Sequence, residues 1–79
     1  MNQKLIIEKN FNLALENHQK NNFQIAERIY KKILKINPNH FQSIFYLGVL
    51  LIETNKFDKA KKLFQKVIQI KPDYVPAHN

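Results

Sequence analysis

The sequence predicts an all-α protein, an α-α superhelical solenoid of two helix–turn–helix repeats followed by the truncated start of a third. Three observations predict it. When the chain is shifted by 34 residues, Ala26 falls on Ala60 and Pro38 falls on Pro72. Apolar residues recur at helical spacing through most of its length. The prolines end helical patterns at the same point of each repeat. Self-similarity at a fixed period of this size is typical of stacked repeats.

Residues 1–20 form the first predicted helix, because their apolar side chains recur at roughly helical spacing. Asn2 is a candidate N-cap. The pair Asn21-Asn22 then ends the helix, since asparagine tolerates the left-handed conformation that closes a helix where glycine is absent. Asn55 occupies the equivalent position of the second repeat. We therefore expect the same kind of turn twice.

Residues 23–36 form the second predicted helix, with a broad apolar stripe on one face and basic side chains on the other. Lysines fall in its last turns, where cations interact favourably with the helix dipole. Pro38 disfavours helical geometry at Asn37 and ends the element. Asn39 is the candidate N-cap of the next helix.

Residues 41–54 form the third predicted helix, which is apolar on nearly all sides. A helix of this kind belongs in the middle of a packed structure. It contains Gly48, the only glycine, although glycine inside a helix costs about 1 kcal/mol relative to alanine. We expect a close helix crossing that leaves no room for a Cβ atom there. The equivalent residue of the first repeat, Ala14, is also small.

Residues 57–71 form the fourth predicted helix, with an apolar side and a lysine-rich side. Asp58 lies near its first turn, where the helix dipole favours a negative charge. Pro72 ends it. The last residues then resemble the entry to another repeat, with Tyr74 in the position of His40.

The two repeats share one spacing pattern. A leucine and a small residue are followed by alanine twelve residues on, an aromatic residue four later, and proline eight after that. This pattern resembles the tetratricopeptide repeat, a helix–turn–helix unit of 34 residues. The resemblance covers nearly the whole chain and implies one domain over residues 1–79. Its parts are repeat 1 over about 7–40, repeat 2 over about 41–74 and a stub over 75–79. The residues that carry the pattern are Leu13, Ala14, Ala26, Tyr30 and Pro38, then Leu47, Gly48, Ala60, Phe64 and Pro72.

The sequence shows no reaction chemistry. It contains no carboxylate pair, no Ser/His/Asp set and no glycine-rich phosphate loop. His18, His40 and His78 are far apart without metal-ligand spacing, and we interpret them as solvated or turn histidines. There is no cysteine. We therefore predict that the protein is not an enzyme and takes no cofactor and no metal.

The resemblance implies a protein-interaction scaffold whose first helices line a concave groove. Such a groove binds a helical or extended peptide. A competing interpretation is that Phe11 and Phe45 simply pack between the repeats. A second alternative comes from similarity to the opening repeats of larger bacterial transferases of the glycosyltransferase kind, in which the chain would recruit substrate or partner. Carried over by position, the groove presents Phe11, Leu15, His18, Phe45, Val49 and Ile52.

The end of the predicted array leads us to expect self-association. Each repeat covers its apolar face with the next, and at least three repeats are usually needed for stability. We expect Leu63, Val67 and Ile68 to be partly uncovered and to form the contact of a homo-oligomer, in the first place a twofold dimer.

The basic composition does not by itself identify a partner. Lysine and arginine number 13 against 6 acidic residues, for a net charge of +7. Arginine clusters and interleaved aromatic residues that indicate nucleic-acid readout are missing, so we do not expect that partner. No run of about 20 apolar residues is present to span a membrane, and the N-terminus lacks the apolar run of a signal peptide. We predict a protein or peptide partner, no membrane partner and a cytoplasmic location.

Overall fold

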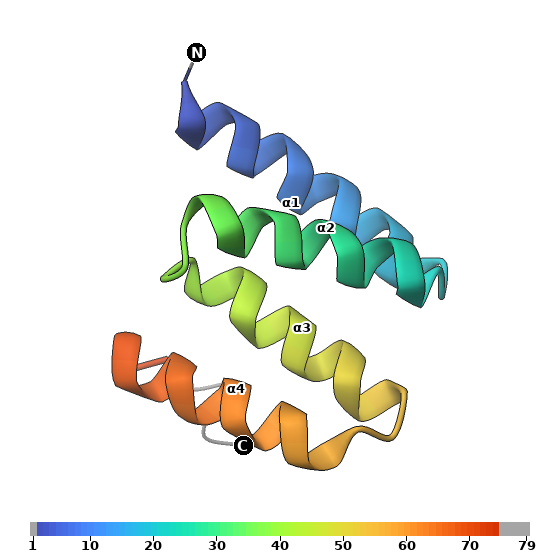
Figure 1. The fold of residues 1–79 in the computed structure, drawn as a ribbon, viewed down its shortest axis with the longest axis vertical. Helices are drawn as coiled ribbons and strands as arrows, with labels where there is room; N and C mark the ends of the chain where they lie inside the picture. Colours follow the sequence, from blue (N-terminus) through green and yellow to red (C-terminus); the bar gives the residue numbers. More distant parts are fainter. Residues whose placement is uncertain (1, 75–79) are drawn as a thin grey trace.

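The computed structural model describes residues 2–74, and these residues form four α-helices. They are α1 (Gln3–Gln19), α2 (Phe23–Ile36), α3 (Phe41–Glu53) and α4 (Phe57–Ile70). Figure 1 shows them stacked in chain order, with α3 between α2 and α4. Helix α1 packs on α2, α2 on α3, and α3 on α4. The all-α class is thus confirmed. The predicted stub at 75–79 and His78 lie outside the described residues.

The asparagines end the first helix of each hairpin as expected. Asn21 and Asn55 both have φ of 64°, in the left-handed region. After each of them a backbone N–H donates to a carbonyl five residues back, from Asn22 to Asn17 at 2.8 Å and from Lys56 to Leu51 at 2.7 Å. This bond satisfies a carbonyl that the helix end would otherwise leave unpaired. The same turn therefore closes α1 and α3.

The N-terminal caps were predicted with one error. The Asn2 side chain accepts a hydrogen bond from the Lys4 N–H at 3.0 Å, which confirms Asn2 as the cap of α1. The prediction of Asn39 as the cap of α3 is wrong, because the cap is His40. The His40 Nδ1 atom accepts from the Ser43 N–H at 3.3 Å. The Asn39 N–H instead donates to Asn37 Oδ1 at 3.1 Å, within the preceding turn.

The turn that follows each hairpin is also repeated. Asn37 has φ −136° and ψ 95°, and Lys71 has φ −136° and ψ 83°. The His40 N–H donates to the Asn37 carbonyl at 3.1 Å, and the Tyr74 N–H donates to the Lys71 carbonyl at 3.0 Å. The internal repeat therefore extends through Tyr74, the last residue described.

Residues from all four helices form the core. Helix α3 contributes most of it, since Ile44, Leu47, Leu50 and Leu51 are all buried. Its central position agrees with its apolar character on all sides. Small residues on the neighbouring helices allow close packing against it. The main cluster of buried residues is Ala14, Ala26, Tyr30, Leu47, Leu50, Leu51 and Ala60.

Gly48 provides the close approach that the sequence predicts. A Cβ atom at this position would lie 2.8 Å from Cε1 of the Phe64 ring, on α4. The neighbour that excludes a side chain is therefore an aromatic ring of the same hairpin. In the first hairpin Ala14 and Tyr30 occupy the equivalent positions, and both are fully buried.

One residue of the expected self-association edge is placed differently. The expectation that Val67 is partly uncovered is wrong, because Val67 is fully buried and packs with Ile44. The equivalent residue of the first hairpin, Ile33, is also fully buried. Val67 faces α3 of its own hairpin, so no further repeat is needed to cover it. Leu63 and Ile68 are half-buried, as expected.

The described residues contain neither a membrane-spanning helix nor a metal-binding cluster. Across residues 2–74, no helix combines the length and the apolar character that crossing a bilayer requires. Within the same range, no group of three or more His, Cys, Asp or Glu side chains is arranged to hold a metal ion.

Candidate functional site

A row of aromatic rings joins the two hairpins along α1 and α3. Its central member is Tyr46, with ring centroids 5.8 Å from Phe11 and 5.2 Å from Phe45. At the two ends, Phe11 contacts His40 at 5.4 Å and Phe45 contacts Tyr74 at 5.3 Å. Phe11 thus contacts the second repeat through Tyr46, whereas the ring neighbours of Phe45 are Tyr46, Phe64 and Tyr74 of its own repeat, and both phenylalanines are half-buried. Sequence reasoning missed Tyr46, whose position between them was not visible from the spacing alone.

A pocket of about 330 Å³ lies between α1 and α3, next to this row. It brings together three of the six residues predicted for the groove, Leu15, His18 and Val49. Phe11 lines a separate pocket near the start of α1. Phe45 and Ile52 line neither of these two pockets. The lining of the pocket is Leu15, His18, Gln19, Asn21, Tyr46, Val49 and Glu53.

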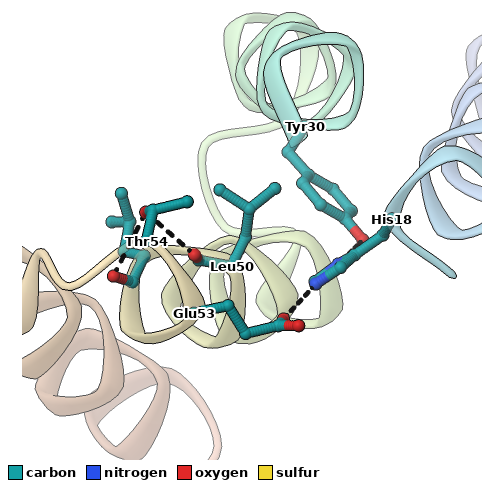
Figure 2. Close-up of polar contacts among 6 residues, drawn as sticks. His18, Tyr30, Leu50, Glu53 and Thr54 are labelled. Carbon is teal, nitrogen blue, oxygen red and sulfur yellow. Dashed lines mark hydrogen bonds and ion pairs between the residues drawn. The ribbon is translucent and has the colours of Figure 1, made fainter. Parts of the chain in front are cut away.

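His18 is held in a polar network that links three helices (Figure 2). Its Nδ1 atom lies 3.0 Å from the Tyr30 hydroxyl oxygen, and its Nε2 atom lies 2.5 Å from Glu53 Oε1. Burial, with added repulsion from Tyr46 and Glu53, raises the pKa of Tyr30 well above its usual value. The hydroxyl therefore stays protonated and can donate to Nδ1, which leaves the Nε2–H to donate to the carboxylate.

The interpretation of His18 as a solvated or turn histidine is therefore wrong. Its side chain is buried, and both ring nitrogens have partners. A buried polar ring without partners would cost stability, whereas this arrangement satisfies it and ties α1 to α3. The ring still forms part of the pocket wall, but its nitrogens are engaged within the chain. His40, by contrast, lies in a turn as expected.

The second hairpin has no such polar network, because the equivalents of His18 and Tyr30 are Ile52 and Phe64. These two side chains lie at an uncovered face. Ile52 is 42% exposed and Phe57 is 59% exposed. Ile52 and Phe57 line a pocket of about 320 Å³ together with Ala60, Lys61, Phe64, Gln65 and Ile68. We call this face the open end and define its apolar residues as Ile52, Phe57, Ala60, Phe64 and Ile68.

The first hairpin shows what covers the open end in a stacked repeat. Its equivalent positions are His18, Phe23, Ala26, Tyr30 and Leu34. Helix α3 lies against this face, and Ala26 and Tyr30 have no exposed surface. The same positions of the second hairpin lack a covering helix within residues 2–74, which explains the exposed Ile52 and Phe57.

The predicted edge residues separate onto different surfaces. Only Ile68 lies at the open end. Leu63 lines a groove between α2 and α4, and Val67 is buried. Ile52, predicted for the concave groove, lies at the open end instead. The 34-residue period relates this face to the positions that α3 covers in the first hairpin, but only the structure identifies those positions.

The fold agrees with the comparisons to known proteins. The tetratricopeptide repeat family model matches residues 14–79. The chain therefore belongs to the tetratricopeptide repeat family, whose members are in general non-catalytic protein-interaction modules.

Solved structures show the same fold. Matches extend to 53 chains. One is described as the crystal structure of MamA, with 24% sequence identity and a TM-score of 0.87. The alignment covers 91% of this chain and 42% of that chain, so the present chain spans less than half the length of its relative. Among curated proteins, none matches this chain.

Proposed function

We propose that this chain is a protein-interaction module whose open end binds an amphipathic α-helix. The main support for the proposal is a comparison of the two hairpins. In the first hairpin α3 covers a set of positions, and at the equivalent positions of the second hairpin Ile52 and Phe57 are exposed. A helix that lies there as α3 lies on the first hairpin would bury them. In this proposal the two repeats, over about 7–40 and 41–74, act as one domain.

The composition of the open end supports an apolar contact. Full burial of a side chain of this size contributes about 1.5–3 kcal/mol. Because Ile52 and Phe64 replace a histidine and a tyrosine, the bound helix needs no acidic residue of the kind that Glu53 provides. An apolar stripe on one side of the helix is sufficient. Loss of translational and rotational freedom offsets part of the gain, so affinity depends on how well the stripe fits.

For the isolated chain, the proposed occupant is a second copy, which gives a twofold dimer in which the open end of each copy covers that of the other. Each copy carries a net charge of +7, and the two copies therefore repel each other. Salt screens such repulsion. The dimer should consequently tighten as the salt concentration rises.

The pocket between α1 and α3 is the second surface in this proposal, for an extended peptide. Leu15, Val49 and Tyr46 give it an apolar wall, and the lining also includes Glu53, whose carboxylate already pairs with His18. Grooves with this mixture of apolar and polar side chains suit peptide side chains at alternate positions. Replacing Val49 with lysine should remove peptide binding here without affecting the open end.

Light scattering behind a sizing column tests the open end. The wild-type chain at micromolar concentrations should show a mass that rises toward that of a dimer. The double variant Ile52→Lys/Phe57→Lys should remain a monomer. The matched control is Leu13→Lys/Ile25→Lys, since Leu13 and Ile25 are each 47% exposed but lie away from the open end. The proposal would be contradicted if the wild-type chain stayed a monomer at every concentration, or if both double variants lost dimer formation equally.

A further inference from the structure

A basic groove separates α2 from α4 on a surface that neither the open end nor the α1–α3 pocket includes. Its floor is formed by Leu47 and Leu51 of α3, both almost completely buried. Half-buried Leu63 adds an apolar wall, and the groove encloses about 290 Å³. Charged side chains stand around this floor. The full lining is Glu27, Lys31, Leu47, Leu51, Lys56, Lys59, Lys62 and Leu63.

The charge of the groove is strongly positive. Four lysines face a single acidic residue, and that residue is already paired, since Lys31 Nζ lies 2.8 Å from Glu27 Oε2. The hydrogen bond from Lys31 lowers the pKa of Glu27, with further attraction from Lys56 and Lys59. Within residues 2–74, neither Lys56, Lys59 nor Lys62 forms an ion pair at 4.0 Å or closer. Three ammonium groups therefore remain to meet an anionic partner.

The combination of an apolar floor and a cationic rim defines the partner. We propose that the groove binds an acidic amphipathic peptide segment of another protein. One leucine-sized side chain of the segment rests on Leu47, Leu51 and Leu63, and flanking Asp or Glu side chains pair with Lys56, Lys59 and Lys62. Lys59 and Lys62 are three residues apart on α4, so their side chains lie on one side of that helix. Carboxylates spaced by one helical turn match this arrangement.

The floor distinguishes such a peptide from other anions. A nucleic-acid backbone presents phosphates without an apolar side chain for the floor, so the groove would give it charge attraction alone. A bilayer surface meets protruding apolar side chains, whereas here the apolar residues lie at the bottom of a groove. The groove shares no residue with the open end, so one chain can use both surfaces.

Fluorescence anisotropy with a synthetic peptide tests the proposal. The probe is a labelled helical peptide of about 15 residues, with two leucines on one face and Asp and Glu beside them. A second probe has serines in place of the leucines at equal charge. Binding is measured in about 150 mM salt. All binding is measured in the Ile52→Lys/Phe57→Lys background, in which the open end does not contribute, and there we expect the first probe to bind about tenfold more tightly than the second.

Charge reversal in the groove supplies the matched comparison. Lys59→Glu/Lys62→Glu should weaken binding of the first probe by about tenfold or more. Lys9→Glu/Lys66→Glu changes the net charge equally at exposed residues that do not line the groove, and it should leave binding nearly unchanged. Circular dichroism confirms that each variant is folded. If the charge-reversal variant unfolds at a lower temperature than the wild-type chain, the variant Lys59→Gln/Lys62→Gln is used in its place.

Three results would overturn the proposal. Equal weakening by both double variants would show that only net charge matters. Equal binding of the serine probe would show that the apolar floor contributes nothing. The third result is displacement of the first probe by other anions, either a polyuridine oligonucleotide of equal charge or anionic vesicles. If they displace it at the same concentration as unlabelled peptide does, the groove attracts anions indiscriminately.

Discussion

At the scale of single residues, the polar network of His18 is the feature that the sequence did not predict. His18 and Tyr30 are 12 residues apart, and Glu53 is 35 residues beyond His18. Their contact exists only after α1 and α2 pair and α3 packs across them. No local pattern of residue types encodes such a meeting. By contrast, the left-handed Asn21 and Asn55 were predictable, because that preference belongs to the residue itself.

Removal of the Tyr30 hydroxyl should destabilise the chain. In Tyr30→Phe, the buried His18 Nδ1 loses its partner, which should lower the free energy of unfolding by about 1–3 kcal/mol. The measurement is urea unfolding followed by circular dichroism. The double variant His18→Ile/Tyr30→Phe copies the second hairpin, which carries Ile52 and Phe64, and should recover most of the loss.

Tyr46→Phe is the control for that experiment, since among the described residues no hydrogen bond of its hydroxyl is present. It should change the free energy of unfolding by no more than about 0.5 kcal/mol. An equal effect of Tyr30→Phe and Tyr46→Phe would show that the contact between Tyr30 and His18 contributes nothing.

His40 should make stability depend on pH. Burial lowers the pKa of His40 in the folded chain below its ordinary value of about 6.5. The unfolded chain therefore binds the proton more readily, and stability is lost as the pH falls from about 6.5 through the folded pKa. Protonation also removes the Nδ1 acceptor that caps α3. His40→Asn keeps a capping acceptor without this titration.

The comparison is made by urea unfolding at about pH 7.5 and about pH 5, on either side of the ordinary histidine value. The drop in the urea midpoint toward the lower pH should be smaller for His40→Asn than for the wild-type chain. An identical drop in both proteins would exclude His40 as a source of the pH dependence.

At the scale of the elements, helix bounds were predicted closely because their determinants are local. Residues 23–36 were predicted for α2, and the structure places it at Phe23–Ile36. Helices α3 and α4 end one residue earlier than predicted, and α1 spans Gln3–Gln19 where residues 1–20 were predicted. The prediction of Asn39 as the cap of α3 was wrong because a tertiary contact decides the cap. Asparagine has the stronger intrinsic preference, but the His40 ring packs on Phe11 and is thereby placed over the start of the helix.

Gly48→Ala tests the close approach of α3 and α4. Alanine improves helix propensity by up to about 1 kcal/mol, but its Cβ would meet the Phe64 ring at 2.8 Å. Overpacking typically costs about 1–3 kcal/mol, so we expect a net loss of roughly 1 kcal/mol in thermal or urea unfolding. In a Phe64→Leu background the same substitution should become stabilising. Stabilisation in the wild-type background would contradict this account of Gly48.

At the scale of the whole molecule, the repeat predicted the fold better than it predicted the surfaces. A helix in a stacked repeat has two apolar sides, one toward its hairpin partner and one toward the next repeat. The sequence shows both sides as one stripe, so Val67, which faces its own hairpin, was assigned to the edge together with Ile68. The basic groove was not predicted either. Lysine is abundant in the sequence, and abundance alone does not indicate which lysines surround an apolar floor.

Within residues 2–74 the open end is thus an apolar face without a covering helix, and we propose that a partner helix packs there. Its counterpart in the first hairpin is filled by α3, with Leu50 fully buried beside Tyr30 (Figure 2). The first hairpin is therefore the best guide to what binds at the open end. The same surface is covered by α3 in the first hairpin and, among the described residues, uncovered in the second.

The most direct test is a dilution series followed by nitrogen–proton correlation spectra of the labelled chain, from high to low micromolar concentration. If the chain dimerises through the open end, the resonances of Ile52, Phe57, Phe64 and Ile68 should shift with concentration. Those of Leu13 and Ile25 should stay fixed. The shifts should grow with added salt, which screens the repulsion between basic copies. Spectra that are independent of concentration, or shifts confined to residues outside the open end, would contradict the account.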